Sequence, residues 1–250
     1  MAGRAWQRAA RWLPRHLPGM LALIAHGAAG RDEDVRGAPV ELLAVTYLPV
    51  EGGALARAQQ GLERLLAPAR VSLMAIEAHR LGWLPPSVTQ QSLLAGGVLL
   101  WGDPAALRVI PSWRPDQLDP RLALDELDGA EAELAAGWPD LAVQRAAGAL
   151  LIARRAYTAR FDERPAALGR VWPEAPPMEA SPADDAASHA ARFVGRARAL
   201  LHDWLFTWEG GPPASEAVRC YIEMWRRGRG ARAAPRGGMG ALRRLPEGAS

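Results

Sequence analysis

The residues best suited to chemistry stand in a glycine-rich turn that follows a short apolar run, Leu21 to Ala25. The turn reads Gly27-Ala28-Ala29-Gly30-Arg31-Asp32-Glu33. Backbone N–H groups in such a turn can cradle an anion, and an arginine beside them can pair with a phosphate. Glu41, near the start of the next apolar run, adds a carboxylate. The pattern indicates an anion site with one acid beside it.

The polar residues around this turn leave two interpretations open. His26 is a candidate base or ligand, although a histidine at the end of a strand is more often a hydrogen-bonded structural residue. Asp32, Glu33 and Asp34 either bend back toward Glu41 to build a metal site or form a solvated acidic loop. The single cysteine, Cys220, excludes an internal disulfide and any multi-cysteine metal site.

Composition removes several function classes. The chain contains no lysine, so all 30 of its Lys+Arg residues are arginine. A P-loop, a protein kinase site and a Schiff-base enzyme each need a lysine amine, and these three classes are excluded. No apolar run approaches the ~20 residues that span a bilayer, which favours a cytoplasmic protein without a membrane partner.

Arginines gather at both ends of the chain, although the net charge is only +3. Arginine-rich tails can hold nucleic acid by releasing counterions. No aromatic residue follows Trp225 to stack on bases, so a solvated tail is the competing interpretation. Glycine, arginine and proline dominate from residue 228 onward, and we expect disorder there.

Strands and helices alternate over about the first 110 residues. The patterns predict a helix at 4–17, disturbed by Pro14, and a second helix at 55–66. Four apolar runs are typical of strands, at 21–25, 40–47, 71–76 and 97–101. This alternation is typical of a sheet with covering helices.

The second half of the chain is alanine- and leucine-rich and predicts a helical unit. The clearest helix is expected at 139–161, with Pro139 at its first position, where a missing N–H costs nothing. A proline-rich loop at 173–185 precedes a helix that Ser181 or Asp185 caps, and a last helix is expected at 214–225. Polar residues gather where the long helix should end, and they either face the site or form an ordinary helix end: Tyr157, Arg160, Asp162, Glu163 and Arg164.

Taken together, the strand, the glycine turn, the arginine-acid pair and a second strand a dozen residues later resemble the DNA polymerase beta-like nucleotidyltransferase superfamily. The resemblance is to its small bacterial members, which carry a C-terminal helical domain. In that family the turn reads Gly-Ser-x-Ala-Arg-Gly-Glu, and the next strand opens with Ser-Asp-x-Asp. The resemblance implies that Gly27, Ala28 and Arg31 occupy nucleotide-binding positions.

The departures from the family pattern concern the groups that do the chemistry. Nucleotidyl transfer needs two divalent cations held by converging carboxylates. The resemblance places Pro39, Glu41 and Ser72 at the three carboxylate positions, and Ala28 replaces the serine hydroxyl that contacts phosphate. Glu41 is therefore the residual catalytic candidate, with Glu41 and Asp32 as candidate metal ligands. No cofactor is implied unless the protein is active, in which case it is Mg²⁺.

The predicted fold class is α+β, a nucleotidyltransferase-like mixed sheet with helices followed by an α-helical bundle. The domains are expected at 1–17 (helix), 18–112 (degenerate nucleotidyltransferase-like), 118–227 (helical) and 228–250 (tail). The first hypothesis is a protein that has lost catalysis and binds a nucleotide, such as a nucleoside triphosphate, or a protein partner. The alternatives are an active Mg²⁺-dependent nucleotidyltransferase on a small molecule or protein, and nucleic-acid binding through the tails.

Overall fold

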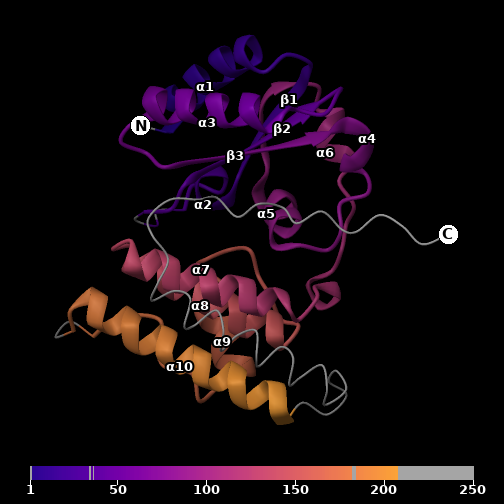
Figure 1. Ribbon diagram of the computed structural model, residues 1–250. Helices are drawn as coiled ribbons and strands as arrows, with labels where there is room; N and C mark the ends of the chain where they lie inside the picture. The colour runs from indigo at the N-terminus through magenta and orange to yellow at the C-terminus, as the bar shows by residue number, and fades with distance from the viewer. Residues whose placement is uncertain (1, 34, 36, 182–183, 208–250) are drawn as a thin grey trace.

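A computed structural model describes residues 2–33, 35, 37–181 and 184–207 (Figure 1). The expected helix at 214–225, Cys220 and the arginine-rich tail lie outside these residues. No described helix is long and apolar enough to cross a membrane.

A four-stranded mixed sheet forms the core of the N-terminal unit, with strand order β3-β2-β1-β4. The strands are β1 (Met20–His26), β2 (Val40–Thr46), β3 (Val71–Glu77) and β4 (Val98–Gly102). β1 is antiparallel to both β2 and β4, whereas β2 and β3 run parallel. The parallel pair is joined by α3 (Gly52–Leu66), because parallel neighbours need a crossover connection.

Helices cover both faces of this sheet. α1 (Ala2–His16) and α3 pack on one face through a core that includes Leu13, Leu23, Leu42 and Leu62. The opposite face, with Ile24 and Leu43, is covered by residues of three short helices, α4 (Ala78–Leu81), α5 (Val88–Gly96) and α6 (Ala105–Arg108). α1 runs through Pro14, near its end, and so lacks the backbone hydrogen bond that an N–H at residue 14 would donate.

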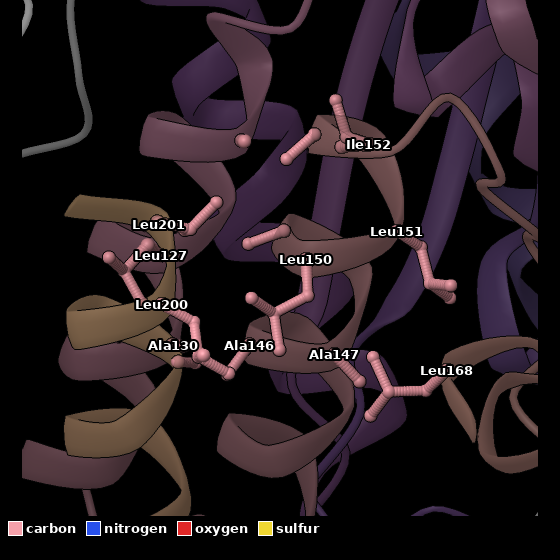
Figure 2. Packing of buried hydrophobic residues seen from close by; sticks show 14 of the residues in the cluster. Leu127, Ala130, Ala146, Ala147, Leu150, Leu151, Ile152, Leu168, Leu200 and Leu201 are labelled. Atoms are coloured by element: carbon pink, nitrogen blue, oxygen red, sulfur yellow. The ribbon is translucent and has the colours of Figure 1, made fainter. Parts of the chain in front are cut away.

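The helical unit follows a single 3₁₀ turn, η1 (Pro115–Gln117), and is built around its own core. Its helices are α7 (Leu122–Ala135), α8 (Pro139–Ala153), α9 (Arg164–Val171) and α10 (Ala186–Thr207). Figure 2 shows leucines and alanines of α7, α8 and α10 interlocking, Leu127, Leu150 and Leu201 among them. Small alanines let these helices approach closely, and α8 is buried along most of its length.

The long helix expected at 139–161 ends eight residues early. Arg155 adopts a left-handed backbone (φ 56°), and the N–H of Ala156 donates to the carbonyl of Leu151. Together with the Arg155 N–H donating to Ile152, this is the hydrogen-bond pattern of a Schellman cap. Asp185 caps α10, since its carboxylate accepts from the N–H of Ser188. The segment between α8 and α9 is thereby free to turn toward the sheet.

Candidate functional site

The glycine turn and Glu41 meet at the edge of the sheet that faces the helical unit. β1 and β2 are antiparallel, so the end of one strand lies beside the start of the other, and His26 pairs directly with Glu41 in the ladder. Both side chains stand on the sheet face that carries Ile24 and Leu43. His26 Nδ1 lies 3.9 Å from Glu41 Oε2.

Residue 27 must be a glycine because Glu41 packs directly against it. Its φ is +70°, and a side-chain carbon there would lie 1.6 Å from Glu41 Oε2. Only glycine tolerates both the left-handed backbone and this approach. Gly27 and the three residues after it form a single helical turn, α2 (Gly27–Gly30).

A serine from α5 stands where the turn lacks a hydroxyl. Ala28 is buried and offers no polar side-chain atom. Ser92 Oγ accepts from the Gly27 N–H at 2.9 Å and from Arg31 Nη1 at 3.1 Å. Gln90, Gln91 and Ser92 continue a polar run that begins at Thr89, and all three are buried.

Arg31 joins the turn to the helical unit. Its Nε and Nη2 donate to Glu33 Oε2 at 3.0 and 2.8 Å, while Glu33 Oε1 accepts from the Phe161 N–H at 3.0 Å. The Arg31 guanidinium also lies 5.4 Å from the centre of the Phe161 ring. Asp32, the second candidate metal ligand, is exposed and does not line the cavity described next.

A cavity of about 130 Å³ lies between the turn and the helical unit. Glu41, Arg31 and His26 line it from the sheet side, as do Gly27, Ala28, Pro39 and Ser92. From the helical side come Glu126, Glu133, Arg145, Tyr157, Phe161 and Arg164. Of the predicted polar cluster, Tyr157 and Arg164 thus face the site, whereas Asp162 is exposed and Arg160 and Glu163 form an ion pair at the surface.

The two glutamates from α7 were not expected from the sequence, and both are paired with arginines. Arg145 lies 3.3 Å from Glu126 and 3.8 Å from Glu133. Arg70, from the sheet unit, donates to both oxygens of Glu133 at 2.7 and 3.2 Å and to the carbonyl of Gly37. This bidentate pair is a second polar link between the two units.

Burial shapes the ionisation of the three polar groups at the centre. Loss of hydration, with the Arg31 charge as the smaller cause, lowers the pKa of His26 to about 4. Burial likewise raises the pKa of Glu41, with the nearby arginines Arg145, Arg31 and Arg164 opposing it. The Glu41 side chain lines the cavity and keeps 37% of its surface accessible. Burial also raises the pKa of Tyr157 to about 12, so its hydroxyl stays protonated.

The residues present do not fit a two-Mg²⁺ centre. Glu41 is flanked by Pro39, which has no ligand atom, and pairs across the ladder with Ser72, a weak neutral ligand that does not line the cavity. Within the described residues, no group of three or more His, Cys, Asp or Glu side chains is placed to hold a metal ion. Mg²⁺ prefers several oxygen ligands in near-octahedral geometry. Glu41 alone does not provide them, and Glu126 and Glu133 are paired with arginines.

The α+β fold resembles that of a solved nucleotidyltransferase. Spectinomycin adenyltransferase AAD(9) from Enterococcus faecialis, solved with ATP and spectinomycin, matches over 91% of this chain and 99% of its own, at a TM-score of 0.52 and 10% identity. A mutant of the toxin-antitoxin MntA-HpeT matches over 41% of this chain and 78% of its own, at a TM-score of 0.34 and 17% identity. No family model and no curated protein sequence matches the chain.

Proposed function

We propose that this chain is a nucleotidyltransferase-like protein that binds a nucleotide in its cleft and has lost metal-dependent nucleotidyl transfer. The observation that carries the proposal is the make-up of the carboxylate positions. Glu41 is alone there, with Pro39 before it and Ser72 beside it. Transfer through two metal ions needs converging acids, and the α7 glutamates are already paired with Arg145 and Arg70.

Retained features support binding. The solved adenyltransferase with the same fold holds ATP. In this chain the turn keeps Gly27 and Arg31, and a hydroxyl from Ser92 stands beside the turn in place of the one missing at residue 28. Arginine side chains neutralise phosphate charge without a metal ion, because their forked N–H groups pair with two oxygens at once.

The test is calorimetry of the purified protein with AMP, ADP, ATP and the other triphosphates, in Mg²⁺ and in EDTA, beside a Glu41→Ala variant. We expect nucleotide binding that persists in EDTA and in the variant, and no transfer of labelled nucleotide to any acceptor. Binding that requires Mg²⁺ and disappears in Glu41→Ala would instead support the active enzyme. Absence of all nucleotide binding would leave the protein-partner hypothesis.

A further inference from the structure

The cavity contains a buried arginine, Arg164, that makes no close ion pair with any described residue, although its charge acts on Glu41 from a longer distance. Arg164 is only 2% exposed. Its three donor nitrogens all bond neutral acceptors: the carbonyls of Thr158 and Gln144 and the hydroxyl of Tyr157. No carboxylate of the described chain lies within ion-pair distance of it. Burying an unpaired charge costs several kcal/mol as an order of magnitude, so the site favours an incoming anion.

The position of this guanidinium is fixed before any ligand arrives. Its carbon lies 4.5 Å from the centre of the Phe161 ring and 5.3 Å from that of Tyr157. Stacking on aromatic rings and bonds to backbone carbonyls hold the plane of the group. A pre-oriented donor loses little entropy on binding, which raises the affinity it can give.

Two further donors in the cavity have no partner for their protons. Both ring nitrogens of His26 are buried and make no hydrogen bond in the structure. Neutral imidazole carries one N–H, which a ligand oxygen would satisfy. Ser92 Oγ receives two hydrogen bonds, from Gly27 and Arg31, so its own hydroxyl proton is left to donate elsewhere.

The size of the cavity limits what it can hold. Its volume of about 130 Å³ is well below the ~300 to 1,000 Å³ typical of pockets that enclose a whole drug-sized ligand. A single compact group fits, with the rest of the ligand outside. Three carboxylates and three arginines line the same cavity. The carboxylates offset the arginine charge, so a metal-free triphosphate would be neutralised less completely there than one phosphate.

We propose that this cavity is a metal-independent subsite for one phosphoryl group, carried by a nucleoside monophosphate, with Arg164, His26 and Ser92 as its donors. Arg164 supplies the fixed positive charge. His26 and Ser92, which lie beside the glycine turn, donate hydrogen bonds to the phosphate oxygens. This inference rests on nucleotide binding as proposed above, and adds the ligand class and the residues.

The experiment is calorimetry in EDTA with inorganic phosphate, AMP and ATP as probes. We expect AMP to bind at least as tightly as ATP, and phosphate to compete with AMP. Arg164→Met should weaken AMP binding by about 10- to 100-fold, because it removes a hydrogen bond to a charged group. Arg164→Lys should recover part of this loss. Arg114→Met, at an exposed arginine, is the matched control and should leave the affinity unchanged.

Because Arg164 is buried, near-ultraviolet circular dichroism must first show each variant folded. Ser92→Ala is the second test, since it removes one hydroxyl with little change of volume, and we expect a loss of about 3- to 10-fold in AMP affinity from a neutral donor. ATP binding in EDTA that neither Arg164→Lys nor Ser92→Ala alters, with no binding of phosphate, would overturn the subsite while leaving the proposed function standing. Binding only with Mg²⁺ would overturn both.

Discussion

Replacing Gly27 with alanine tests the contact on which the site depends. Alanine at a φ of +70° costs roughly 1–2 kcal/mol from its backbone alone. The new methyl group would stand 1.6 Å from Glu41 Oε2, so the glutamate must leave its position, at a further cost of about 1 kcal/mol for a displaced rotamer. We expect Gly27→Ala to lower the free energy of unfolding by about 2–3 kcal/mol.

A matched glycine separates the two contributions. Gly19 has a φ of +77°, and an added side-chain carbon there would have no heavy atom within 4 Å. Gly19→Ala should therefore show only the backbone cost. The assay is urea unfolding of both variants, with and without Glu41→Ala, read as a double-mutant cycle.

In the Glu41→Ala background the effect of Gly27→Ala should fall to that of Gly19→Ala, giving a coupling of about 1 kcal/mol between residues 27 and 41. Equal effects of the two glycine substitutions in the wild-type background, with no coupling to Glu41, would refute the reasoning. Glu41 would then not rest against the turn.

Three other predictions concern stability, each measured by urea unfolding. His26 has a pKa of about 4 in the folded protein and near 6.5 in the unfolded chain, so unfolding takes up a proton between pH 4 and pH 6.5. The free energy of unfolding should therefore be highest above pH 6.5 and fall by up to ~3 kcal/mol as the pH is lowered to 4. His26→Leu should flatten this pH dependence, whereas His79→Leu, at an exposed histidine, should not. Arg70→Ala should cost about 1–3 kcal/mol because it leaves a buried glutamate with a weaker partner, while Arg114→Ala at the surface should stay within about 0.5 kcal/mol. Leu150→Ala should cost about 2–5 kcal/mol, since the side chain is fully buried in the helical core; a smaller loss would mean that the core closes around the gap.

The sequence predicted the elements whose apolar pattern is regular. The bounds of β1, β2, β3 and α3 lie within three residues of the predicted ranges. The strands are apolar runs because helices cover both faces of the sheet, and α3 has apolar residues at helical spacing because one of its faces is buried. α5 was missed, since its buried face includes Gln90, Gln91 and Ser92, and polar residues disguise the period. The end of α8 was predicted too late, because an arginine at residue 155 does not indicate the left-handed backbone found there.

The candidate site was only partly predictable for a related reason. Glu41 and the glycine turn are separated by few residues and adjoin paired strands, so their meeting follows from the order of the strands. Glu126 and Arg145 reach the cavity from helices far along the chain, and their placement depends on how the two units pack. The nucleotide-binding roles of Gly27, Ala28 and Arg31 remain predictions.

The early end of α8 decides where the second wall of the cavity comes from. If α8 continued to residue 161, Phe161 would lie about 12 Å beyond Ala153 along the helix axis, at a rise of ~1.5 Å per residue. The left-handed residue Arg155 instead folds the chain back, so that the Phe161 N–H reaches Glu33 and Tyr157 reaches Arg164. One backbone conformation thus places the polar contacts that line this side of the cavity. A substitution at Arg155 that lets α8 continue would therefore open the cavity, although Arg155 does not itself line it.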